Sequence, residues 1–176
     1  MTHSFRTTVL PRFGNRTLNI CRYDKENWQH VSGVEALLAQ LGPIQETETA
    51  LRRAKMAIAC PTNILVGEVL GEVVAVAFTM HNRAEAHVWN LVVSTNSRGL
   101  GIGTAFLGLI LSLLEEKEVI RVLLRALNPT PLTKALLVRR GFINDALDPS
   151  FWHHTITSAS LPPGPAPNVK PATPTE

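Results

Sequence analysis

The residues best suited to chemistry are an arginine and three alternating glycines near the middle of the chain. Arg98, Gly99, Gly101 and Gly103 stand between two apolar segments. Glycines at this spacing leave several backbone N–H groups free of crowding by Cβ atoms, and a helix that begins at the loop adds the positive end of its dipole. The junction is therefore predicted to bind a phosphate group of a ligand.

Two common phosphate-binding motifs do not fit this loop. A dinucleotide motif, G-x-G-x-x-G, would need glycine at Thr104 or at Phe106, and a nucleotide P-loop would need Lys followed by Ser or Thr after its last glycine. What remains, Arg98-x-x-Gly101-x-Gly103 directly after an apolar strand, resembles the acyl-CoA pyrophosphate loop of the GCN5-related N-acetyltransferases (GNAT). A tight turn between a strand and a core helix is the structural alternative, but such a turn requires fewer glycines.

This resemblance implies a site for acetyl-CoA, as co-substrate, that is made mainly of backbone groups. In the family, the strand before the loop bulges and presents backbone groups to the pantetheine and the thioester carbonyl, while the loop wraps the pyrophosphate. The residues that the resemblance implies for the cofactor are Leu91, Val92, Val93, Arg98, Gly99, Leu100, Gly101, Ile102, Gly103, Thr104 and Asn128. Asn128 ends the next strand and precedes a proline, so it is also a frequent kind of turn initiator.

Transfer of an acetyl group to an amine also needs a base for the ammonium proton. Some members of the family use a residue on the strand before the loop, at the position that His87 occupies here. Glu85 lies two residues earlier and shares the same face of an extended strand, so it could orient or replace His87. The alternative is that His87 is a partly exposed strand residue and Glu85 a solvated charge near a turn.

Two positions depart from the family pattern. The tyrosine that many members place four residues before the glycine of Gly141-Phe142, where it protonates the departing thiolate, is Leu137 here. A glutamate or histidine base that others place on the following strand is Leu123. A thiol pKa near ~8.5 makes thiolate a tolerable leaving group, so slower transfer is expected. A catalytically degenerate module that binds acyl-CoA or a protein partner is the alternative.

The other elements are predicted in the order of this fold, which the resemblance covers from about residue 17 to 158. We expect a strand at 17–22, a helix from a capping box at Ser32 and Glu35 to residue 41, and a second helix at 45–59. An antiparallel meander over 64–94 precedes a helix at 101–116, a strand at 119–127 buried on both sides, a helix at 132–140 that ends at Gly141, and a strand at 151–158. The fold class is α/β (α+β), with a mixed, mostly antiparallel central sheet flanked by helices.

The 176 residues, 45% of them hydrophobic, fit one soluble domain. Residues 1–15 are predicted as an irregular leader, 16–160 as the acetyltransferase-like domain and 161–176 as a proline-rich disordered tail. The net charge of +3 comes from scattered basic residues, which does not favour nucleic-acid binding. The longest apolar run, 99–114, contains four glycines and is too short for a membrane span.

Cofactors other than acetyl-CoA are not expected. Cys21 and Cys60 lack metal-site spacing and are predicted as buried free thiols in a reducing, cytoplasmic compartment. His153 and His154 are adjacent on a strand and so point to opposite faces, without an evident third ligand, and no metal site is predicted. The acceptor is left open among a protein N-terminus, a lysine side chain, an aminoglycoside-like amine and a small metabolite; a homodimer is also left open.

Overall fold

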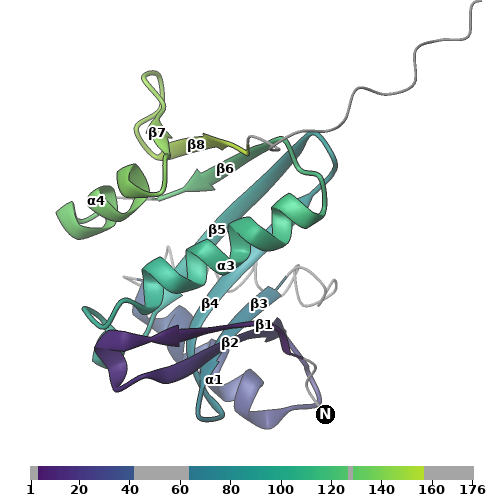
Figure 1. Ribbon diagram of the computed structural model, residues 1–176, viewed down its shortest axis with the longest axis vertical. Helices are drawn as coiled ribbons and strands as arrows, with labels where there is room; N and C mark the ends of the chain where they lie inside the picture. Colours follow the sequence, from purple (N-terminus) through teal and green to yellow (C-terminus); the bar gives the residue numbers. More distant parts are fainter. Residues whose placement is uncertain (1–3, 42–63, 127–128, 157–176) are drawn as a thin grey trace, which may run out of the picture.

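The computed structural model describes residues 4–41, 64–126 and 129–156 (Figure 1). The predicted helix at 45–59, Cys60, Asn128 and the proline-rich tail lie outside these residues. Among the described residues, no helix is long and apolar enough to cross a membrane.

The described elements form one eight-stranded sheet in the order β1-β2-β3-β4-β5-β6-β8-β7. Every neighbouring pair is antiparallel except β5 and β6, which are parallel. The predicted mixed, mostly antiparallel sheet is therefore confirmed. The strands are β1 Ser4–Leu10, β2 Arg16–Arg22, β3 Ile64–Val69, β4 Glu72–His81, β5 Glu85–Val93, β6 Arg121–Arg125, β7 Ile143–Asn144 and β8 Phe151–Thr155.

Two helices cover opposite faces of this sheet (Figure 1). Helix α3, Ile102–Glu116, packs Phe106 and Ile110 into the larger apolar cluster, whereas α1, Trp28–Leu38, packs Val34 and Leu38 into the smaller one. Helix α4, Pro131–Arg139, connects β6 to β7. The helices predicted at 101–116 and 132–140 are thus confirmed, and Gly141 takes the left-handed conformation, φ 78°, expected of the residue that ends α4.

Two predictions for the first forty residues were wrong. Residues 1–15 are not an irregular leader throughout, because β1 pairs with β2 and Leu10 is buried. Pro11 and Gly14, which interrupt the sequence pattern, form the turn between these strands. The first helix begins four residues before the predicted capping box: Asn27 caps it by accepting the Gln29 N–H at 3.0 Å.

The strand predicted at 119–127 is shorter than expected and is not buried on both sides. In β6, Val122 and Leu124 are buried in the cluster beneath α3, whereas Arg121, Leu123 and Arg125 on the other face are partly or fully exposed. This alternation is the ordinary pattern of a strand with one covered face. The leucine-rich sequence obscured it because Leu123 occupies a position on the open face.

Candidate active site

Strand β5 contains a bulge three residues before its end. Asn90 and Leu91 of β5 lie opposite the single residue Ala77 of β4. Asn90 has φ 52°, in the left-handed region that few residues other than glycine adopt. As a result Trp89 packs toward the cluster beneath α1 and Leu91 toward the cluster beneath α3. The bulge re-aims the end of β5, as bulges next to functional sites commonly do.

Beyond this point β5 and β6 separate. Their backbone pairing runs only from Glu85 to Val88 on β5, against Arg121 to Leu124 on β6. From Trp89 onward, the edge of β5 that faces β6 has no described partner strand. We call this place the fork. Along this edge, which faces away from β4, backbone N–H and C=O groups between residues 89 and 93 are left without a strand partner and can bind an extended ligand.

The glycine loop follows directly. Gly99 and Gly101 have φ 78° and 85°, and a Cβ atom added at either would meet nothing within 4 Å. These glycines are thus required by the backbone conformation, and the space over the loop is open. Gly101 is also the N-cap of α3, with no side-chain cap. The first N–H groups of α3 are consequently available to an anion.

Gly103 and Arg98 differ from Gly99 and Gly101 in what surrounds them. A Cβ atom at Gly103 would lie at ordinary contact distance, 3.5 Å, from the Val93 side chain, so this position can hold a larger residue. The Arg98 Nε donates to the Val93 carbonyl at 3.2 Å and so folds the arginine back onto the end of β5. The structure thus gathers the predicted cofactor residues from 91 to 104 at one edge of β5.

Arg140, which was not among the predicted site residues, connects α4 to the loop. Its Nη2 donates to the Thr104 carbonyl, in the first turn of α3, at 2.7 Å. A Cβ atom at Gly108 would lie 2.9 to 3.1 Å from the Arg140 guanidinium, which therefore rests on the helix backbone. A glycine inside a predicted helix was the available signal, because such a glycine usually has a packing reason.

The two predicted catalytic residues lie together at the other end of β5. His87 Nε2 is 2.8 Å from Glu85 Oε1, and Glu85 Oε2 is 3.7 Å from the Arg121 Nε. The carboxylate accepts the Nε2 proton, so in the neutral ring Nδ1 carries the lone pair. The His87 side chain is 43% exposed, which leaves this lone pair accessible to a substrate or water.

In the described part of the chain, three buried side-chain donors without a partner lie on strands β5, β6 and β8. Among the described residues, the buried side-chain nitrogen and oxygen atoms without a partner are Asn90 Nδ2, Arg125 Nε and Trp152 Nε1. All three are hydrogen-bond donors, and they come from β5, β6 and β8, which are neighbours in the sheet. Arg125 lies on the open face of β6, whereas Trp152 packs in the cluster beneath α3. Asn90 alone lies at the bulge, and its unpaired donor suits a ligand with an acceptor oxygen.

Comparisons with known proteins show the family of this chain. The profile of the Acetyltransferase (GNAT) family matches residues 28–142, which is more than half of the chain. The chain belongs to the GNAT acetyltransferase family. No curated protein matches the sequence.

Several solved GNAT structures share the fold. Ard1 from Thermoplasma volcanium superposes with a TM-score of 0.64 at 19% identity, over 80% of this chain and 98% of its own. The ribosomal-protein-S18-alanine N-acetyltransferase from Escherichia coli gives 0.60 at 16%, over 82% and 97%. The PaiA N-acetyltransferase from Thermoplasma acidophilum, solved in complex with coenzyme A, gives 0.57 at 12%, over 77% and 96%.

The two positions that depart from the GNAT pattern, Leu137 and Leu123, carry apolar side chains in regular parts of the structure. Leu137, at the position of the usual tyrosine acid, is fully buried in the cluster beneath α3. Leu123, at the position of a second kind of base, pairs with His87 on β5 and offers no titratable group. Neither position can supply or accept a proton. The structure places His87 and Glu85 together but does not replace the missing acid with another tyrosine, since the buried Tyr23 lies just beyond β2.

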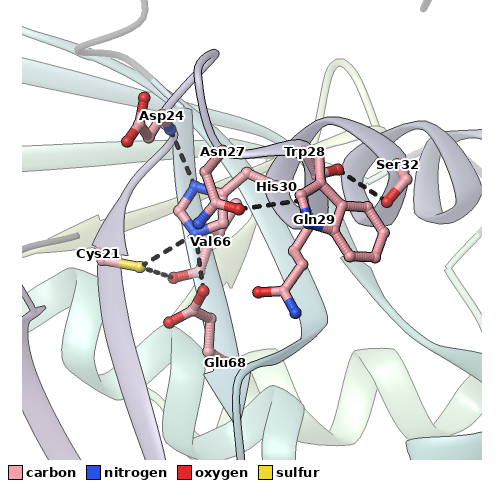
Figure 2. Close-up of polar contacts among 9 residues, drawn as sticks. All are labelled: Cys21, Asp24, Asn27, Trp28, Gln29, His30, Ser32, Val66 and Glu68. Carbon is pink, nitrogen blue, oxygen red and sulfur yellow. Dashed lines mark hydrogen bonds and ion pairs between the residues drawn. The ribbon is translucent and has the colours of Figure 1, made fainter. Parts of the chain in front are cut away.

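A second polar cluster lies beneath α1 (Figure 2). His30, fully buried, is 2.7 Å from Glu68 through Nε2 and 3.9 Å from the Cys21 Sγ. The potential ligand atoms of these three residues lie within 4.8 Å of one another, as a metal site would require. Cys21 is buried and free, as the sequence predicted, whereas His30 and Glu68 were not singled out.

The hydrogen bonds of this cluster argue against a metal ion at this place. The Asp24 N–H donates to His30 Nδ1 at 2.9 Å, so the neutral ring carries its proton on Nε2, which Glu68 accepts. A histidine that binds a metal through Nε2 instead donates from Nδ1. Burial, assisted by Glu68, raises the pKa of the Cys21 thiol to about 12, and the thiol donates to the Val66 carbonyl. The cluster is a closed network that ties α1 to β2 and β3.

A cavity of about 390 Å³ lies apart from the fork. It opens between α1 and the turn from β3 to β4, and its lining includes Trp28, Gln29, Leu70 and Ser94. None of the residues predicted for the cofactor or for catalysis lines it. The candidate site is therefore defined by the bulge, the fork and the loop, and this cavity takes no part in it.

Proposed function

We propose that this GNAT protein is an N-acetyltransferase that moves an acetyl group from acetyl-CoA to a primary amine by direct attack within a ternary complex. The observation that carries the proposal is the succession of bulge, fork and open glycine loop along one edge of β5. This edge offers unpaired backbone groups first and a helix N-terminus next, in the order that a thioester, a pantetheine arm and a pyrophosphate would need.

The described residues fit this cofactor. Acetyl-CoA supplies the acetyl group as an activated thioester. Leu91, Val92 and Val93 would bind its pantetheine arm through the free edge of β5, and the N–H groups from Gly99 to Thr104 would bind its phosphates. The unpaired buried Nδ2 of Asn90 at the bulge supports the assignment, because acetyl-CoA carries carbonyl acceptors.

His87 is proposed as the base. Its Nδ1 would take the ammonium proton of the acceptor, and the Glu85 carboxylate, bonded to Nε2, would stabilise the imidazolium that results. Asn90 lies three positions beyond His87, about 10 Å of extended strand, so the proton would travel through water. The neutral amine then attacks the thioester carbon and a C–N bond forms. The C–S bond breaks to release thiolate, and the attacking nitrogen loses one further proton to the thiolate through water.

A protein N-terminus is the first acceptor to test, a choice supported by the name of the S18-alanine N-acetyltransferase that shares the fold. The buried free thiol of Cys21 supports a cytoplasmic location. A homodimer would be tested by light scattering.

The test is thiol release from acetyl-CoA with a panel of amines that includes short peptides, lysine and aminoglycosides. Amine-dependent release at a rate that saturates with acetyl-CoA is the expected result. Binding of acetyl-CoA without release for any amine would favour the second candidate, a non-catalytic acyl-CoA-binding module. The burial of Leu137 at the acid position is the observation that favours this second candidate.

A further inference from the structure

Asn90 combines two uncommon features. Its backbone is in the left-handed region, φ 52°, and its side-chain Nδ2 is buried without a hydrogen-bond partner. Strained backbone and unpaired buried donors persist where function requires them. The two occur together at the bulge of β5, on the edge that β6 has left.

The position of Asn90 in the proposed site is specific. Asn90 directly precedes Leu91 to Val93, the segment proposed to bind the pantetheine arm, and it follows the last residues of β5 that pair with β6. The reacting thioester would lie at this end of the arm, on the side toward His87. An amide donor at the bulge is thus placed where negative charge develops during transfer.

We propose that the Asn90 side-chain amide donates a hydrogen bond to the thioester carbonyl oxygen as that oxygen becomes an oxyanion. This inference rests on the proposed function. The amine lone pair forms a bond to the carbonyl carbon, and the C=O π pair moves to the oxygen, which accepts the Asn90 N–H. The carbonyl then re-forms, the C–S bond breaks, and the thiolate leaves with the bonding pair. Asn90 transfers no proton; the ammonium proton goes to His87 through water.

Leu137 offers no proton to the thiolate, so stabilisation of the charge that develops on the carbonyl oxygen matters more. The Asn90 amide would act beside the backbone N–H groups at the unpaired edge of β5. The other two unpaired donors fit this task less well. The Arg125 guanidinium contacts the Phe151 ring, 5.7 Å from its centroid, and Trp152 lies on β8, two strands away from β5.

The decisive variant is Asn90→Gly, because glycine keeps the left-handed backbone of the bulge and removes only the amide. Asn90→Asp keeps the shape and places a negative charge where the donor was. Asn15→Gly is the matched control: Asn15 has φ 54° and lies in the turn between β1 and β2. We expect Asn90→Gly to lower kcat about 10²-fold to 10³-fold, with KM and the Kd of acetyl-CoA unchanged, and Asp to lower it further.

A second readout does not depend on turnover. The carbonyl stretch of bound acetyl-CoA labelled with ¹³C at the thioester carbon is expected to lie at lower frequency in the wild type than in Asn90→Gly. Unchanged kcat in an active Asn90→Gly variant, or a loss confined to KM, overturns the inference and leaves the proposed function in place. If the wild type binds acetyl-CoA without turnover, the proposed function fails, and an equal carbonyl frequency in both proteins overturns the role of Asn90. Absence of acetyl-CoA binding by the folded wild type overturns both.

Discussion

The two ends of β5 are built in different ways. At its carboxyl end the proposed cofactor site consists of backbone groups: the unpaired edge after the bulge, two left-handed glycines and the N-terminus of α3. At its amino end the proposed base depends on two side chains, His87 and Glu85, held 2.8 Å apart. A backbone site tolerates changes of side chain, whereas a side-chain site is lost with a single substitution. This difference explains how the loop can persist while the usual acid position has become Leu137.

The largest effect is expected from a charge placed in the backbone site. Gly103→Glu fits sterically, because a Cβ atom there would make only ordinary contacts with Val93 and Leu136. Its carboxylate would face the pyrophosphate, and one such repulsion, ~4 kcal/mol at 4 Å, corresponds to about 10³-fold weaker binding of acetyl-CoA. Calorimetry measures the change. Gly103→Gln, which has the same shape without the charge, is the control, and equal affinities for the two variants would remove the loop from the phosphate site.

Substitutions of His87 and Glu85 should lower kcat and leave the Kd of acetyl-CoA unchanged. His87→Ala is expected to lower kcat by about 10² because the general base is lost, with the Kd of acetyl-CoA unchanged. Glu85→Gln should have a smaller effect, since it weakens only the stabilisation of the imidazolium. His81→Ala, at the exposed end of β4, is the matched control. If His87→Ala turns over like the wild type, the base lies elsewhere.

A smaller effect is expected where α4 contacts the loop. Arg140→Ala removes the charged hydrogen bond to the Thr104 carbonyl and should weaken acetyl-CoA binding about tenfold. Gly108→Ala should have a similar effect, because its methyl group would displace the guanidinium. In the Arg140→Ala background the same Gly108→Ala change should leave affinity unaltered and raise stability by ~1 kcal/mol, through helix propensity. Additive losses of affinity would contradict this coupling.

The smallest functional effect is expected in the network beneath α1, outside both sites. The folded-state pKa of Cys21 is raised to about 12, above its value in the unfolded chain. As pH rises from about 9 toward 12 the unfolded state binds fewer protons, so the free energy of unfolding falls by ~1.4 kcal/mol per pH unit from this thiol. Denaturant unfolding of Cys21→Ala should lack this component, while its acetyl-CoA affinity at pH 7 stays unchanged. The same pH dependence in both proteins would show that folding does not raise the pKa of the Cys21 thiol.

The sequence predicted best what is local. The meander that became β3 to β5, α3, α4 and the left-handed Gly141 are each specified by neighbouring residues, and all are confirmed. The phosphate-binding role of the glycine loop stays a prediction. The first strand was missed because Pro11 and Gly14 read as an irregular leader, although they form a turn.

Contacts between distant residues could not be predicted in the same way. Arg140 reaches Thr104 across 36 positions, and His30 reaches Glu68 across 38. The unpaired amide of Asn90 depends on a bulge whose register is fixed by β4 and on the separation of β6. The periodicity of the sequence cannot predict these contacts, because each one forms only when the whole sheet has assembled.

The most direct test of the account is backbone amide hydrogen exchange with and without acetyl-CoA. We predict slower exchange within residues 91–93 and 99–104, where unpaired N–H groups would bind the cofactor, and no change in β2. Unchanged exchange at both loop and fork, or protection confined to the cavity between α1 and the turn at Leu70, would contradict the claim that the carboxyl end of β5 is the acetyl-CoA site.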